Sequence, residues 1–158
     1  MTTLVLMIVA AGTYVPQGGA DHLTVTSGGG RQVCYPASPE VAFDVVGPAQ
    51  ASVVLYVDLP KKPAKPGPVK VVVAIDGKTK PTMVKPKRAA KVRYEETSER
   101  EPSAAFKPIK IPLGAGEHIL TVTFPKERSG CVHIRGLDLR ESRESDMPVA
   151  VAAVAPLP

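Results

Sequence analysis

The sequence has 158 residues and contains no tryptophan, and all aromatic residues together make up only 4% of it. Because 44% of the residues are hydrophobic, a core has to be built mainly from Val, Ile, Leu and Ala. A chain of this length is one domain's worth, and it can bury roughly two-thirds of its unfolded surface without help from a metal or a cofactor. We therefore expect a single domain with an aliphatic core and no cofactor.

Long helical patterns are also missing. No stretch of 12 residues carries apolar side chains at a 3.6-residue spacing, and 17 prolines interrupt the chain along its whole length. Apolar and polar residues instead alternate, as in half-buried strands. In residues 51–59 this alternation predicts that odd-numbered side chains face one side of a sheet and even-numbered ones the other. The sequence predicts an all-β fold, a two-sheet antiparallel, jelly-roll-like β-sandwich of seven to nine strands.

Signatures of catalysis and of metal binding are absent as well. The chain has no Cys-x-x-Cys, Gly-x-Ser-x-Gly, His-Glu-x-x-His or Ser-x-x-Lys motif. Its three histidines, His22, His118 and His133, are far apart and do not have the spacing of metal ligands. The acidic run "EETSERE" (95–101) is interpreted as a solvated loop. We therefore predict a protein that is not an enzyme and has no metal site.

The ends of the chain differ in composition from the middle. Residues 1–20 contain a short apolar run followed by small residues, which fits either a signal peptide or a first strand. The run is far shorter than the ~20 residues that span a bilayer, so no transmembrane span is predicted. Residues 21–140 are assigned to the β-sandwich, and residues 141–158 to a flexible tail rich in Ala and Pro.

Two cysteines, Cys34 and Cys131, fit export to the periplasm or the extracellular space, where they are predicted to form a disulfide. The alternative is a cytoplasmic protein with two small buried thiols. Closing a loop of about a hundred residues would stabilise the fold by on the order of 4–5 kcal/mol in the chain-entropy model.

Turn and strand motifs in the second half resemble those of known modules. The stretch "VKVVVAIDGKTK" and the later "LGAGEHILTV" are similar to the second half of galactose-binding-like jelly-roll modules, the architecture of many carbohydrate-binding modules. The resemblance covers about seventy residues, and it implies a fold rather than a ligand. The matching positions are Asp76, Gly77, Lys78, Leu113, Gly116, His118, Leu120 and Val122.

Positive charge is concentrated in residues 61–93. This segment holds eleven Lys or Arg and one acid, so it carries +10 while the rest of the chain carries −5. A strand over 69–75 is predicted to separate a loop at 60–68 from a loop at 77–89, which would place two basic patches about 20–25 Å apart. Such a division argues against nucleic acid, which favours one continuous basic surface with aromatic residues.

These observations predict a non-catalytic exported accessory module, binding or structural, that docks an anionic surface or partner through basic loops. The anion would be a glycan, a lipid headgroup or an acidic protein. A carbohydrate-binding module is the alternative, and a nucleic-acid-binding protein the second alternative. Lysines and prolines that only keep sheet edges from pairing are the competing structural interpretation. The candidate contact residues are Lys78, Lys85, Lys87, Arg88 and Lys91.

Overall fold

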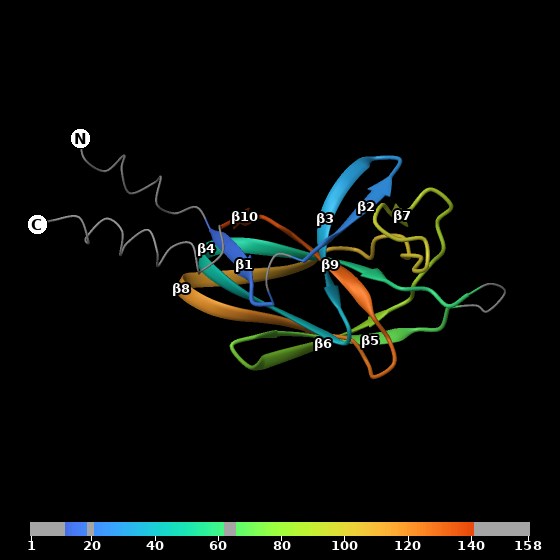
Figure 1. Cartoon of the computed structure of the whole chain (residues 1–158). Helices are drawn as coiled ribbons and strands as arrows, with labels where there is room; N and C mark the ends of the chain where they lie inside the picture. Colours follow the sequence, from blue (N-terminus) through green and yellow to red (C-terminus); the bar gives the residue numbers. More distant parts are fainter. Residues whose placement is uncertain (1–11, 19–20, 62–65, 141–158) are drawn as a thin grey trace, which may run out of the picture.

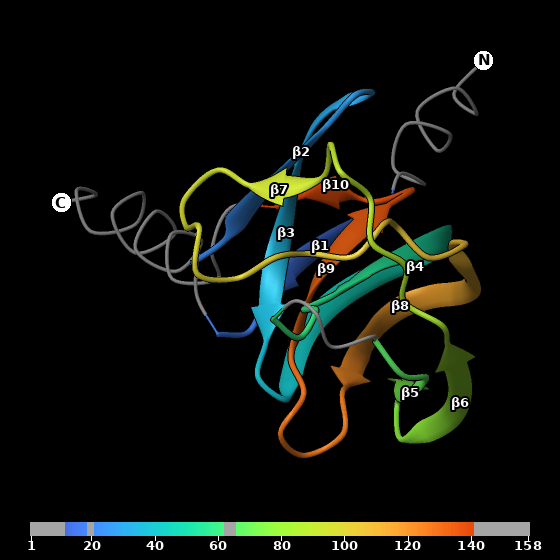
Figure 2. The same ribbon diagram turned by 90° about the vertical axis from the view of Figure 1, so that its right-hand side faces the viewer.

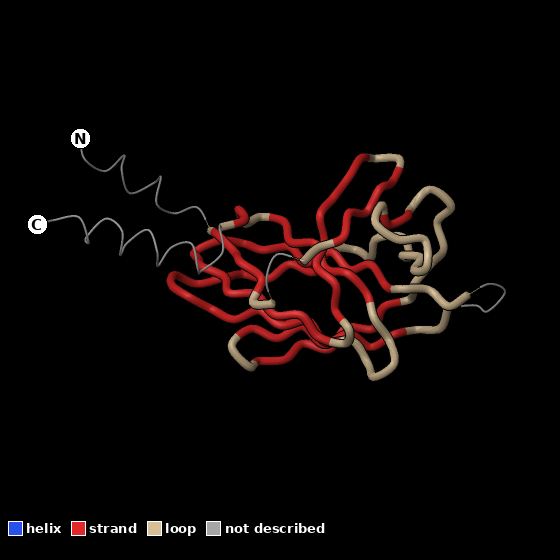
Figure 3. The backbone as a smooth tube through the Cα atoms, viewed as in Figure 1, coloured by secondary structure: helices blue, strands red, loops and turns tan. Residues whose placement is uncertain are grey.

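The computed structural model describes residues 12–18, 21–61 and 66–140 (Figure 1). Within these residues all regular elements are strands, and no helix is long and apolar enough to cross a membrane (Figure 3). The all-β prediction is therefore confirmed. The strands are β1 (Thr13–Pro16), β2 (Leu23–Ser27), β3 (Gly30–Ala37), β4 (Glu40–Val57), β5 (Val69–Ile75), β6 (Lys78–Val84), β7 (Arg93–Tyr94), β8 (Ile109–Thr123), β9 (Gly130–Arg135) and β10 (Asp138–Leu139).

Hydrogen bonding joins these ten strands into one open sheet. Its main path is β6-β5-β8-β4-β9-β3-β2-β7, and β1 adds to β4 while β10 adds to β1. Neighbours are antiparallel except for the short parallel pair β1–β10. The structure thus has more strands than the seven to nine predicted. The finer prediction of a two-sheet jelly roll is not confirmed, because the pairing runs through a single sheet.

Two long strands, β4 and β8, form the centre of the sheet and bend together (Figure 1). Their register shifts between Gly47 and Ala49, where β8 contributes an extra residue, as in a β-bulge. Gly116 at this point has φ +98°, and a side chain on Gly47 would lie 2.1 Å from the Gly114 carbonyl oxygen. Glycine is therefore required for the close approach that lets the sheet curve around its core.

The main core lies on one face of this curved sheet. It contains residues from both halves of β4, for example Phe43 and Leu55, together with Val71 of β5 and Val122 of β8. The side-chain alternation predicted for residues 51–59 is confirmed, since odd-numbered residues from 51 to 57 belong to this core. Apart from Phe43 and a few other rings, the core is aliphatic, as the composition indicates.

A second, smaller cluster lies on the opposite face. It includes the even-numbered residues Val54 and Tyr56 of β4, the two cysteines, Val25 and Tyr94. Tyr94 comes from the segment of residues 85–107, which we call the strap. In Figure 2 the strap is the yellow segment that carries β7 and passes in front of β3. The strap therefore closes a small core of its own on the back of the sheet.

Two details of the predicted layout are wrong. The stretch after Asp76-Gly77 is not a loop but the edge strand β6, which pairs with β5 and brings the chain back toward residue 60. The Arg88 guanidinium donates a hydrogen bond of 2.6 Å to the Pro60 carbonyl oxygen. Pro60, which begins the first basic loop, and Arg88 of the second therefore lie together at the start of β5, so the prediction of two patches at opposite ends of that strand is wrong.

The predicted end segments fall mostly outside the described residues. The apolar run in residues 1–11 and the whole of residues 141–158 lie there, so the signal-peptide and tail assignments stay predictions. Thr13–Pro16, however, is strand β1, paired with β4. Its Tyr14 and Val15 are buried, and Tyr14 forms edge-to-face contacts with Tyr35 and Phe43. Part of the 1–20 segment is thus integral to the folded domain.

Candidate functional site

The five predicted contact residues do not gather in one place. Lys85 and Lys87 lie together just after β6. Lys78 begins β6, and a seven-residue strand places it roughly 20 Å from them. Lys91 lies beside Gly28 in the β2–β3 turn. Of the predicted lysines, Lys85 and Lys87 therefore remain as one surface.

Arg88 is engaged inside the protein. Its guanidinium forms a 3.0 Å ion pair with the Glu101 carboxylate and also donates to Pro60. Only 23% of the Arg88 side chain is exposed. Arg88 thus joins the start of the strap to the acidic run at 95–101, and the Glu101 carboxylate compensates the charge of Arg88.

Lys85 and Lys87 line a groove between the two ends of the strap. We call it the lysine groove and define it by Met83–Lys87 on one wall and Ala104–Lys107 on the other. The groove has a volume of about 440 Å³. One hydrogen bond of 2.8 Å, from the Ala104 amide to the Lys87 carbonyl, joins the walls. Sequence reasoning missed Lys107 because it lies twenty residues further along the chain and outside the basic stretch.

The groove combines an apolar floor with a basic rim. Val84 and Pro86 are buried, and Phe106 is half-buried against the main core. Lys85, Lys87 and Lys107 are exposed. Within the described residues the four ion pairs use arginines and one histidine, and no lysine. The groove therefore offers three uncompensated positive charges around a surface that water solvates poorly.

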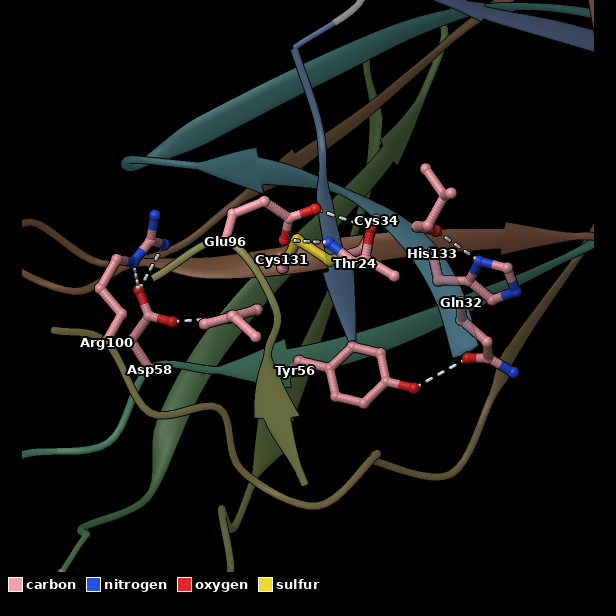
Figure 4. Close-up of a disulfide and its surroundings, with 11 residues drawn as sticks. Thr24, Gln32, Cys34, Tyr56, Asp58, Glu96, Arg100, Cys131 and His133 are labelled. Carbon is pink, nitrogen blue, oxygen red and sulfur yellow. Dashed lines mark hydrogen bonds and ion pairs between the residues drawn. A yellow bond between two sulfur atoms is a disulfide. The ribbon is translucent and has the colours of Figure 1, made fainter. Parts of the chain in front are cut away.

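The middle of the strap shows the opposite arrangement. The Asp58 carboxylate accepts hydrogen bonds from Tyr94 (2.7 Å), Arg100 (2.8 Å) and Ser129 (2.5 Å). Figure 4 shows the Arg100 guanidinium turned toward Asp58. Arg100 also stacks over the Tyr94 ring. Only 12% of the Asp58 side chain is exposed. Burial and the Asp58 carboxylate raise the pKa of Tyr94 well above its usual value. Tyr94 therefore stays a neutral donor, and the strap is anchored on a buried charge network.

The acidic run in the strap is a solvent-exposed loop, as predicted, but two of its carboxylates are bonded to neighbouring strands. Glu95 pairs with Arg31 of β3, and Glu96 accepts hydrogen bonds of 2.7 Å from both the amide and the hydroxyl of Thr24 (Figure 4). Hydrogen bonding to Arg31 holds the pKa of Glu95 below its usual value, and the Thr24 amide does the same for Glu96. By accepting the Thr24 amide, the Glu96 carboxylate extends the short pairing of β7 with β2. The partners of both carboxylates are distant in sequence, so no local pattern could reveal them.

The predicted disulfide is confirmed beneath the strap. Cys34 of β3 and Cys131 of β9 are bonded and fully buried (Figure 4). The bond joins residues 97 positions apart within the same small core as Tyr94. Such a bond indicates an oxidising environment and fits export.

A second concave site surrounds His118. The His118 ring makes hydrogen bonds from Nδ1 to the Asp76 carboxylate (2.7 Å) and from Nε2 to the Gly114 carbonyl oxygen (2.9 Å). The Asp76 hydrogen bond raises the pKa of His118, and His118 in turn lowers the pKa of Asp76. A histidine paired with an aspartate resembles a catalytic base and its orienting carboxylate. Here both ring nitrogens face acceptors, so neither is left to take a proton from a substrate.

Two carboxylates of that cleft are also bonded internally. The cleft has a volume of about 370 Å³ and includes Asp44, which accepts a 2.9 Å hydrogen bond from the Gln17 side-chain amide. Asp76 also accepts the Ile119 amide and so ties the β5–β6 turn to β8. Within the described residues no group of histidine, cysteine and carboxylate side chains could hold a metal ion. Because His118, Asp76 and Asp44 are bonded within the fold, the lysine groove is the stronger candidate site.

Comparison of the chain with protein-family models, with curated proteins and with solved structures gives no match. The resemblance to galactose-binding-like modules therefore stays a prediction, and the function has to be argued from the lysine groove itself.

Proposed function

We propose that this chain is a non-catalytic exported module that docks an anionic partner through the lysine groove. The observation that carries the proposal is the set of three exposed lysines, Lys85, Lys87 and Lys107, around one apolar floor with no acid among the lining residues. Charge segregated in this way attracts anions and speeds their encounter. The disulfide supports the exported setting, because such bonds persist in oxidising compartments.

The groove fits this function better than nucleic-acid binding. A nucleic-acid surface needs phosphate contacts along an extended path and aromatic faces on which bases stack. The groove is short, and Phe106 is its single aromatic residue. It also differs from a site for neutral ligands, since its rim carries charge without compensation.

The test compares two triple variants of equal charge. Lys85→Gln, Lys87→Gln and Lys107→Gln remove the rim, whereas Lys78→Gln, Lys80→Gln and Lys110→Gln remove three exposed lysines elsewhere on β6 and β8. Binding to three anionic probes is measured by titration: polyglutamate, a heparin oligosaccharide and phosphatidylglycerol vesicles. We expect the rim variant to lose about tenfold or more in affinity for at least one probe, and the control variant to lose far less.

Two results would overturn the proposal. Equal losses in the two variants would mean that net charge, and not the groove, attracts the anions. Absence of saturable binding to all three probes at about 50 mM salt would mean that the lysines meet only water, because low salt strengthens such contacts.

A further inference from the structure

We infer that the occupant of the lysine groove is an acidic protein segment in extended conformation, with one apolar side chain between two carboxylates. This inference rests on the proposed function, and it specifies the class of partner. It is drawn from the spacing of the lysines and from the apolar floor beneath them.

The spacing of the rim lysines matches an extended peptide. Lys85 and Lys87 are exposed, and Pro86 between them is buried, so this wall alternates as a strand does. Alternate side chains of an extended chain lie about 7 Å apart on the same side. A segment with the pattern acid–apolar–acid can therefore place its two carboxylates near the two lysines. Its middle side chain then points to the opposite side of the peptide, into the groove that Met83 and Phe106 line.

The floor of the groove suits that middle side chain. Met83 is 56% exposed, one of few large apolar side chains at the surface of the described residues, and it lines the groove with Phe106. Covering Met83 and Phe106 with an apolar side chain removes their surface from water and favours binding. A purely charged ligand would leave this surface exposed, so the floor selects for an amphipathic occupant.

The cations around the groove require an anion. All three are lysines, whose ammonium group is a compact point charge, and the neighbouring Arg88 is already bonded to Glu101 and Pro60. Such point charges attract carboxylates, phosphates and sulfates alike. The choice of an acidic protein segment therefore rests on the spacing of the lysines and on the apolar floor.

The test is an NMR titration of the full ¹⁵N-labelled chain with two short synthetic peptides. One has the sequence Gly-Ser-Glu-Leu-Glu-Ser-Gly, and the other has Ser in place of Leu. We expect the Leu peptide to shift the amides of Lys85, Lys87 and Phe106, and to bind about fivefold more tightly than the Ser peptide. Met83→Ser should remove most of that advantage. Leu139→Ser, at a side chain of similar exposure (59%) on β10, should leave it intact.

The outcomes separate this inference from the proposed function. If a heparin hexasaccharide or phosphatidylglycerol vesicles shift the same amides and the Leu peptide does not, the proposed function stands and the inference is wrong. Equal affinity of the Leu and Ser peptides would also overturn the inference, because the floor would then play no part. If no anionic probe shifts these amides, both the proposed function and the inference are lost.

Discussion

The middle of the strap and its two ends carry many charges, and they use them differently. In the middle, residues 94–101, Glu95, Glu96 and Arg100 bind groups of the same chain, and Asp58, the partner of Arg100, is largely buried. At the ends, Lys85, Lys87 and Lys107 are exposed and have no ion pair within the described residues. The density of charge along the sequence therefore does not show whether charged residues bind a partner or stabilise the fold. The interaction partners of each charge do. The changes below are ordered from the largest expected effect to the smallest.

Removing the disulfide beneath the strap should have the largest effect. Cys34→Ala with Cys131→Ala opens a loop of 97 residues and leaves space in the small core, and we expect a loss of about 2–5 kcal/mol in the free energy of unfolding. Urea denaturation checks this value. The exposed change Leu139→Ala is the control, at within about 0.5 kcal/mol of the wild type. A double variant as stable as the control would show that the strap is held without the bond.

Breaking the buried network of the strap should come next. Asp58→Asn removes the charge that accepts from Arg100 and Tyr94, leaves Arg100 without its partner, and is expected to cost about 2–4 kcal/mol. The exposed Glu99→Gln, in the same segment, is the matched control. Urea denaturation and amide exchange at Tyr94 report the effect. If Asp58→Asn and Glu99→Gln were equally stable, the buried Asp58 network would contribute no more to stability than an exposed residue of the strap.

The all-β class, the disulfide and the alternation of residues 51–59 could be predicted from the sequence because each follows from local pattern or composition. In a strand, every second side chain points to the same face, whichever strands lie beside it. Leu139 shows the limit, since it continues the alternation of its strand but is 59% exposed. It lies in β10, which is paired only with the short β1, so nothing covers that face among the described residues.

The candidate site could be predicted only in part. Lys85 and Lys87 stand out in the basic stretch, but Lys107 and Phe106 join them through the fold of the strap. Lys78 and Lys91 belong to the same basic stretch but lie away from the groove. Lys78 is at the first residue of β6, and Lys91 lies beside the β2–β3 turn. Pairing over long sequence distances decides which charges meet, and it also explains why the run 95–101 is bound to β2 and β3.

The ion pair between His118 and Asp76 lies at the surface, and we expect it to have an intermediate effect on stability that depends on pH. The folded-state pKa of His118 is raised, so its contribution to stability is complete below about pH 6.5, the usual value for histidine, and is lost as the pH rises through the folded pKa. The pKa of Asp76 is lowered, so its contribution is present above its usual value near 4 and is lost in acid. The pair therefore stabilises most between about pH 4 and 6.5.

The matched measurement compares His118→Gln with the wild type. At pH 5.5 we expect the wild type to have a higher melting temperature than the variant, by less than the differences that the two changes above produce. This gap should narrow steadily toward pH 9. Glu117, Asp44, Lys78 and Arg140 also lie near this pair and are retained in both proteins, so their contribution to stability largely cancels in the difference. A gap that is constant or widens with pH would contradict a protonated His118 in the folded state.

Neutralising the rim of the lysine groove should have the smallest effect on stability. Lys85→Gln, Lys87→Gln and Lys107→Gln remove exposed charges that pair with nothing in the described part of the chain, so the free energy of unfolding should change by less than about 0.5 kcal/mol, even though binding of an anionic partner falls. Relief of repulsion among three neighbouring lysines favours the stabilising direction. Arg31→Gln on β3, which removes the ion-pair partner of Glu95 in the middle of the strap, should destabilise the fold slightly. Urea denaturation distinguishes the two, and a rim variant less stable than Arg31→Gln would place the lysines among the structural charges.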